Sequence, residues 1–203
     1  MKSLYADVAA DAVRAFHDRA VARGAAAESG APEGADDAWR WIAVNHRCNC
    51  LLWAEEDLAR RTDVPDAEIA RNKRAIDRFN QQRNDAVERI DEVLLARAAA
   101  VPLQKGAWHN SETAGAMIDR LSILALKLHA MGNEARRADA TNEHRAACAE
   151  KLGRLALQRD DLARCLDALL ARAAEGHAFW RVYRQFKMYN DPDLNPQLYG
   201  RKR

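Results

Sequence analysis

The sequence predicts an all-α protein, a single-domain helical bundle of about five to six helices around a buried central helix. In every long segment, apolar side chains recur three or four residues apart, which is the spacing of one helix face. The chain has only nine Gly and five Pro in 203 residues, and its Ala, Leu, Arg, Asp and Glu content favours helices. This length is enough for one core, so we expect one domain over residues 1–203.

The first predicted helix covers residues 3–23, with Val8, Val13 and Phe16 among its apolar positions. The stretch AAAESGAPEGA follows and has the Gly, Pro and Ser content of a linker. We expect a loop at about residues 24–36, inside the domain, because the first helix is too short to be stable alone.

The second predicted helix covers residues 37–61 and carries polar side chains beside its apolar stripe. Asn45, Asn49 and Glu56 follow the helical spacing of Ile42 and Leu52, so they border the core. Polar groups at that position need partners from a neighbouring helix or from a ligand.

The third predicted helix, residues 66–99, carries a stripe of five polar residues. Their spacing of 3, 4, 4 and 3 residues stacks them on one face: Asp77, Asn80, Asn84, Glu88 and Asp91. A solvated face is the ordinary interpretation. Because Asn is a poor helix former, two in mid-helix favour a tertiary purpose, and a pocket lining is the alternative.

The central helix is predicted over residues 110–131, with Asn110 as its cap. It is apolar on nearly every side, which is typical of a buried helix. It nevertheless carries the charged side chains Glu112, Asp119, Arg120 and Lys127. A buried charge must be paired or face a cavity, so the segment predicts a polar site inside the bundle, with Asp119 and Arg120 as a buried pair.

Two further helices are predicted over residues 140–173 and 177–189, with an extended tail at about residues 190–203. The longer helix has a continuous Leu stripe. The shorter one places Phe179, Val182 and Phe186 on one face, and Asn190-Asp191-Pro192 ends it.

Charge and cysteine content limit the classes of function. The formal net charge is +2, from 32 basic and 30 acidic residues, which gives no support for a nucleic-acid partner or a membrane surface. The four Cys form no CxxC pair, which favours reduced core thiols. No apolar run is long enough for a signal peptide or a membrane span, so we expect a cytoplasmic protein.

The polar side chains expected beside the core form one candidate site if the helices that carry them are neighbours. Four carboxylates among them are candidate ligands of Mg²⁺ or Mn²⁺, namely Glu56, Glu88, Asp91 and Asp119. The alternative is a salt-bridge network that fixes helix register without any ligand. The full candidate set is Asn45, Trp53, Glu56, Asp57, Asp77, Asn80, Arg83, Asn84, Glu88, Asp91, Asn110, Glu112, Asp119, Arg120 and Lys127.

Four segments carry a resemblance to a known family. LLWAEEDLARR, NKRAIDRFNQQRNDAVERID, NSETAGAMIDRLSILALKLHAM and FKMYNDPDLNPQLY, which together span residues 51–199, resemble the successive motifs of the bacterial domain-of-unknown-function family 4254 (DUF4254). The resemblance implies a cytosolic, all-helical bacterial protein associated with cell-envelope glycan and glycosyltransferase genes, and it supplies no activity. Ala54 stands where many members have His, so no catalytic role is carried over to that position.

Three functions remain open at the level of sequence. The preferred hypothesis is binding, with or without processing, of a phosphorylated or nucleotide-linked sugar, with Arg83 or Arg120 as the anion contact. The enzymatic alternative resembles metal-dependent nucleotide pyrophosphohydrolases. The third is a scaffold for glycosyltransferases, which would dock on Arg181, Tyr183, Arg184 and Lys187 and on the tail. A homo-oligomer is compatible with all three.

Overall fold

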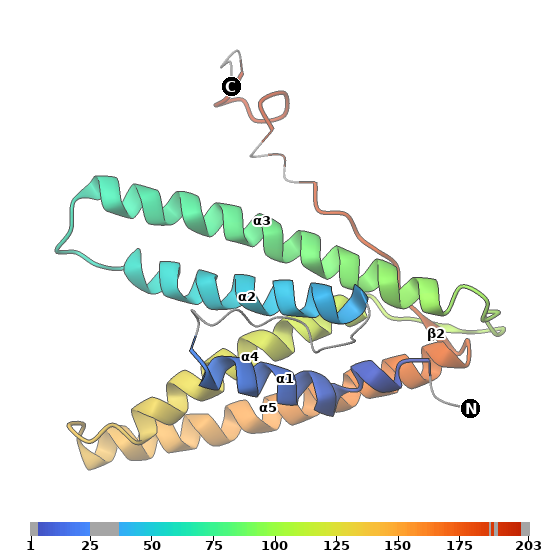
Figure 1. The fold of residues 1–203 in the computed structure, drawn as a ribbon, viewed down its shortest axis with the longest axis horizontal. Coiled ribbons are helices and arrows are strands. Elements are labelled where there is room, and N and C mark those ends of the chain that lie inside the picture. Colours follow the sequence, from blue (N-terminus) through green and yellow to red (C-terminus); the bar gives the residue numbers. More distant parts are fainter. Residues whose placement is uncertain (1–3, 25–36, 187, 189–190, 200–203) are drawn as a thin grey trace.

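The computed structural model describes residues 4–24, 37–186, 188 and 191–199 (Figure 1). Its elements are the 3-10 helix η1 (Ala6–Val8), the helices α1 (Ala10–Ala22), α2 (Asp37–Leu58), α3 (Asp66–Arg97), α4 (Ala114–Ala135) and α5 (Asn142–Ala174), and the short strands β1 (Trp108–His109) and β2 (Ala178–Phe179). These elements confirm the all-α fold class. The predicted loop at 24–36 falls, apart from Gly24, outside the described residues. None of the described helices combines the length and the apolar character needed to cross a membrane.

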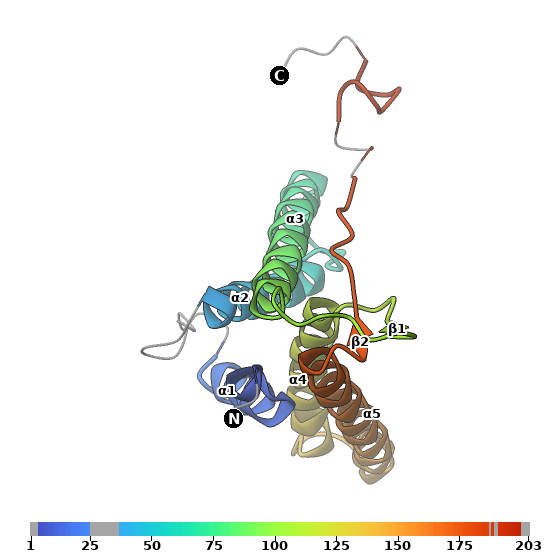
Figure 2. The same cartoon turned by 90° about the vertical axis from the view of Figure 1, so that its right-hand side faces the viewer.

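The helices form two hairpins that lie against each other (Figures 1 and 2). One hairpin pairs α2 with α3, and the other pairs α4 with α5, while α1 packs against α4 and α5. Helix α4 contacts each of the other four α-helices, which confirms its predicted central place. Residues at the point where α4 meets α2 and α3 therefore have side chains from three helices around them.

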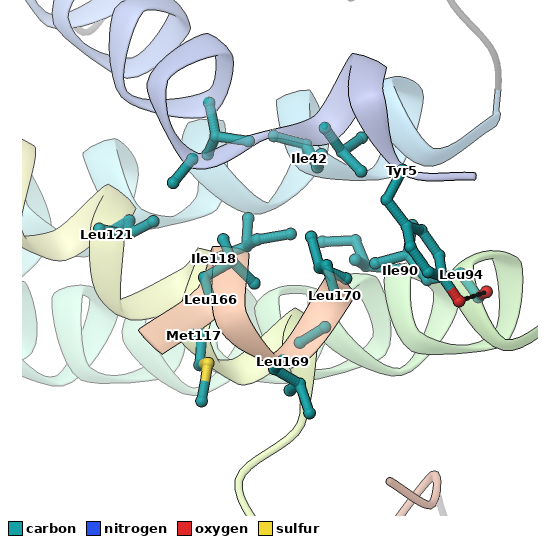
Figure 3. Packing of buried hydrophobic residues seen from close by; sticks show 14 of the residues in the cluster. Tyr5, Ile42, Ile90, Leu94, Met117, Ile118, Leu121, Leu166, Leu169 and Leu170 are labelled. Carbon is teal, nitrogen blue, oxygen red and sulfur yellow. Dashed lines mark hydrogen bonds between the residues drawn. The ribbon is translucent and has the colours of Figure 1, made fainter. Parts of the chain in front are cut away.

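The core lies between the two hairpins, and Figure 3 shows its packing. Ile42 of α2, Ile118 and Leu121 of α4 and Leu166 of α5 are completely buried. Tyr5, ahead of α1, donates a hydrogen bond from its hydroxyl to the Leu94 carbonyl at 3.1 Å. This bond satisfies the polar end of an otherwise buried ring.

The N-terminus of α4 differs from the sequence prediction. Thr113, and not Asn110, caps the helix, because its hydroxyl accepts from the Ala116 N–H at 3.1 Å. Asn110 instead donates its side-chain amide to the Glu112 carbonyl at 2.7 Å. The prediction was wrong because several adjacent residues can act as caps, and the helix begins after the last of them.

The predicted helix at 177–189 is also absent from the described residues. Ala178 and Phe179 pair in parallel with Trp108 and His109, and the chain continues to Phe186 without a helix. Ala178 and Trp180 are buried while Arg181 and Tyr183 are exposed, an alternation typical of extended chain. Aromatic and β-branched side chains favour extended chain, and the spacing of the apolar side chains here fits a strand as well as the predicted helix.

Substitution of Gly115 tests the close approach of α4 to α3. A Cβ at Gly115 would lie 2.6 Å from the Val87 carbonyl oxygen of α3 and 3.0 Å from the Asp91 side chain. Gly115→Ala should therefore lower the free energy of unfolding by about 1–3 kcal/mol, because backbone must shift to admit the methyl group. Urea unfolding followed by circular dichroism measures the change.

Gly153→Ala is the matched control, because a Cβ at this position in α5 meets nothing within 4 Å. Removing a helical glycine in open space should raise the free energy of unfolding by about 0.5–1 kcal/mol. Equal effects of the two substitutions would contradict the close contact at Gly115.

Candidate functional site

A buried polar contact joins α2 to α4. Asn45 and Asn49 lie one turn apart on α2, and both side-chain amides donate to Oδ1 of Asp119 on α4, each at 2.8 Å. Asn49 also lies 3.0 Å from the Ser122 hydroxyl. Asn45 and Ser122 are completely buried. Because buried amides are costly without partners, these bonds fix the register of the two helices.

The contact continues inward to a pair of histidines. His46 Nδ1 lies 2.8 Å from the Ser122 hydroxyl, and the His46 and His17 rings stack with their centroids 4.7 Å apart. Burial lowers the pKa of His46 to about 4, against an opposing effect of Asp18. Burial, followed by the charges of His46 and Arg159, holds the pKa of His17 well below its usual value. Both rings are therefore neutral at neutral pH.

The outer side of the same contact opens into a cavity of about 290 Å³, which we name the polar groove. Helices α2, α3 and α4 all contribute to its wall. Its lining residues are Asn49, Leu52, Trp53, Glu56, Asp57, Arg60, Asn80, Arg83, Ile123 and Leu126. The fold thus brings together five of the candidate residues, namely Trp53, Glu56, Asp57, Asn80 and Arg83. Asn45 lies one turn before Asn49 and binds Asp119 without lining the groove.

Arg83 is the distinctive charge of the polar groove. Its Nη2 donates to the Asn84 side-chain oxygen at 3.1 Å, and its buried Nε has no hydrogen-bond partner among the described residues. The other arginine of the groove, Arg60, is paired with Glu56 at 3.1 Å. No ion pair joins Arg83 to a carboxylate in the described part of the chain, so its charge is the one available to an anion.

The polar stripe of α3 divides along its length. Asp77 is exposed and lies apart from the groove lining, whereas Asn80 lines it. Towards the C-terminal end of the helix, the next two residues of the stripe bind Gln185, in the chain that follows β2. Asn84 donates to the Gln185 side-chain oxygen at 2.7 Å, and Glu88 accepts from the Gln185 N–H at 3.0 Å.

Asp91, the last residue of the stripe, lies at the start of α4. Its Oδ1 accepts from the Gly115 N–H at 2.7 Å, where the helix dipole favours a negative group. Burial raises the pKa of Asp91 to about 6, and hydrogen bonds including that from Gly115 oppose the increase. The carboxyl group therefore joins α3 to α4 and takes no part in the polar groove.

The remaining candidates on or near α4 lie elsewhere. Arg120 pairs with Glu112 at 2.6 Å and not with Asp119, so the predicted buried pair does not form. Adjacent helix positions point about 100° apart, and this turns Arg120 outward while Asp119 faces α2. Asn110, Glu112 and Arg120 line a different groove, between α4 and α5, and Lys127 is exposed.

The four carboxylates considered as metal ligands occupy separate surroundings. Glu56 pairs with Arg60, and Asp119 accepts hydrogen bonds from two Asn side-chain amides. Glu88 accepts from the Gln185 N–H, and Asp91 accepts from the Gly115 N–H at the start of α4. Across residues 4–24, 37–186, 188 and 191–199, no three His, Cys, Asp or Glu side chains are grouped so that they would hold a metal ion.

Sequence reasoning missed two parts of this site. Arg60 lines the groove, and the His17–His46 pair extends the polar contact into the core. One signal was present on α2, where Asn45 and Asn49 are four residues apart and His46 and Cys50 repeat the interval beside them. No signal links His17 to His46, because the contact depends on how α1 packs.

The fold and the groove define a helical-bundle protein with a polar cavity between two helical hairpins. The chain belongs to the family described as Protein of unknown function (DUF4254), whose model matches residues 39–182. This range includes all the residues that line the polar groove. No curated protein and no solved structure matches the chain.

The buried histidine pair predicts a dependence of stability on pH. Because burial lowers the pKa of His46 from 6.5 to about 4, the unfolded chain binds the proton more tightly than the folded chain. The contribution of neutral His46 to the free energy of unfolding is complete above pH 6.5. As the pH falls towards 4 this contribution is lost, which lowers the free energy of unfolding by about 3 kcal/mol. Urea unfolding between pH 7 and 4 measures it.

The difference between the parent and His46→Gln reports His46 together with its effect on the stacked His17, since the carboxyl of Asp91 titrates in both. The variant should lose less stability than the parent over this range. His177→Gln, at an exposed side chain, should keep the parental dependence. Identical pH dependence of the parent and His46→Gln would show that His46 is not held neutral in the folded state.

Proposed function

We propose that the polar groove binds a phosphorylated monosaccharide, with Arg83 as the contact to the phosphate. The observation that carries the proposal is the Arg83 guanidinium, which lines the groove, has a buried and unbonded Nε, and has no carboxylate partner among the described residues. A buried N–H without a partner is costly, and a phosphate oxygen that accepts from the Arg83 guanidinium would relieve that cost.

The rest of the groove wall suits a sugar ring. Trp53 is 36% exposed and offers an apolar ring face. Asn49 and Asn80 offer amide groups, and Asp57 offers a carboxylate with no ion pair in the described residues. Amides and carboxylates supply the donors and acceptors that hydroxyl groups need. Apolar and polar groups thus lie on the same wall.

The size of the groove favours a small ligand within this class. Its volume of about 290 Å³ is at the lower end of ligand cavities, which are commonly about 300–1,000 Å³. A hexose phosphate suits this volume better than a nucleotide-linked sugar. The ligand class also agrees with the envelope-glycan setting that the family resemblance implies.

Binding is preferred here to metal-dependent phosphoanhydride hydrolysis. That reaction relies on carboxylates that hold the metal ion near the phosphates. Glu88 and Asp91 lie outside the polar groove, and of the groove's two carboxylates Glu56 is paired with Arg60. The groove therefore has one cation, Arg83, that is unpaired within the described residues and that an anion can contact. Its two carboxylates are not grouped with further described ligands as a metal site requires.

Thermal unfolding in the presence of EDTA tests the proposal. Glucose 1-phosphate and mannose 1-phosphate are the ligands, and glucose and inorganic phosphate are the partial ligands. At a hundredfold excess over Kd, a ligand that binds the folded chain adds about 2.7 kcal/mol. For a chain of this size, that corresponds to a rise in Tm of about 5–10 °C. Each partial ligand should give a smaller rise.

Arg83→Gln should weaken this binding by about 10- to 100-fold, because it removes a charge-assisted hydrogen bond of about 1.5–3 kcal/mol. Arg74→Gln is the matched control, since Arg74 is an exposed arginine on the same helix and outside the groove. A shift that is absent in EDTA and appears only when Mg²⁺ or Mn²⁺ replaces it would favour hydrolysis instead. An equal loss of binding in both variants, or no shift with either sugar phosphate, would remove the support for a phosphate site at Arg83.

A further inference from the structure

A second groove lies between α4 and α5, and the polar groove does not include any of its residues. It has a volume of about 860 Å³, and we name it the α4–α5 groove. Met117, Leu155 and Leu162 give it an apolar floor. Leu157 and Trp108, also in its lining, are 61% and 50% exposed. Large apolar side chains exposed in a groove indicate an interaction surface.

The charge in this groove is positive. Three arginines and two carboxylates line it. Two of the arginines are already paired, Arg120 with Glu112 at 2.6 Å and Arg154 with Glu150. Arg172 lies over the Trp108 ring at 5.8 Å, and it forms no ion pair with a carboxylate of the described residues. The groove is therefore complementary to a segment that carries both apolar side chains and a negative charge.

Residues 191–199 of the same chain are such a segment. Leu194 and Tyr199 are 47% and 59% exposed, and Asp193 is exposed without an ion pair in the described part of the chain. Figures 1 and 2 show the segment projecting away from all the helices. Its apolar side chains therefore have no helix of their own bundle to cover them.

The segment is ordered by its own hydrogen bonds. The Asp191 side chain accepts from the Asp193 N–H at 2.9 Å, and the Asn195 side chain accepts from the Gln197 N–H at 2.9 Å. Both contacts are turns closed by a side chain. A segment that is already folded into turns loses less conformational entropy when it binds.

The direction of the segment is set where the chain leaves the bundle. Arg184 forms ion pairs with both Glu88 and Glu92 of α3, and Gln185 is bonded to Asn84. From this anchor on α3, residues 191–199 extend away from the side of the bundle formed by α4 and α5 (Figure 2). The α4–α5 groove of the same chain therefore lies on the opposite side of the bundle from residues 191–199 (Figure 2).

We propose that residues 191–199 of one chain dock in the α4–α5 groove of a second copy of this chain. Asp193 pairs with Arg172 of the other copy, and Leu194 and Tyr199 cover its apolar floor. One chain carries both the unfilled groove and the unpacked segment, so reciprocal exchange gives a closed two-fold dimer.

Light scattering on the full chain tests the exchange by charge reversal. The parent should be a dimer, and Arg172→Glu or Asp193→Arg should weaken dimerisation by at least about 30-fold, as loss of a buried charge pair does. The double variant, which restores opposite charges, should dimerise again. Asp63→Arg, at an exposed site between α2 and α3, is the control and should remain a dimer.

Labelling of Cys165 with a thiol reagent gives an independent measurement. Cys165 lines the α4–α5 groove, and it alone of the four cysteines is exposed. In the parent, the labelling rate should fall as the chain concentration rises, whereas in either single variant it should stay high. Circular dichroism confirms that the variants are folded. A monomeric parent, a dimer that survives either single reversal, or a labelling rate independent of concentration would overturn the proposal.

Discussion

The contact of Asn45 and Asn49 with Asp119 is the interaction on which the candidate site depends. It joins the two helical hairpins through α2 and α4, and both amide donors reach the same carboxylate oxygen at 2.8 Å. A shift of one helix by a single residue would leave these buried groups without partners, which is costly. The contact therefore sets the register that brings both Trp53 of α2 and Leu126 of α4 into the wall of the polar groove.

Helix α3 completes the groove and also holds the rest of the chain in place. Asn80 and Arg83 face the cavity, while the next turns of the same helix bind the C-terminal segment and the start of α4. The approach of α4 depends on Gly115, where any side chain would meet the α3 backbone. A single amphipathic helix thus positions the groove wall, the central helix and the exit of the chain.

Much of the fold could be predicted from the sequence because helices are encoded locally, in periodicity and capping residues. The polar face of α2 could also be predicted, because helical spacing places it beside apolar residues, and Arg83 is one of two predicted anion contacts. The division of the α3 stripe could not, since Asn80 and Glu88 share one face and differ only in which segment lies opposite. The extended course of residues 178–186 depends on pairing with residues 108–109, distant in sequence, which local spacing does not reveal.

The central claim is that Arg83 provides an uncompensated positive charge for a phosphate at the junction of α2, α3 and α4. A crystal structure of the full chain grown with glucose 1-phosphate tests it most directly. The account predicts phosphate oxygens within hydrogen-bonding distance of the Arg83 guanidinium and the sugar ring against Trp53. Arg83 turned onto Asp57, with the groove closed and the ligand absent or bound elsewhere, would contradict it.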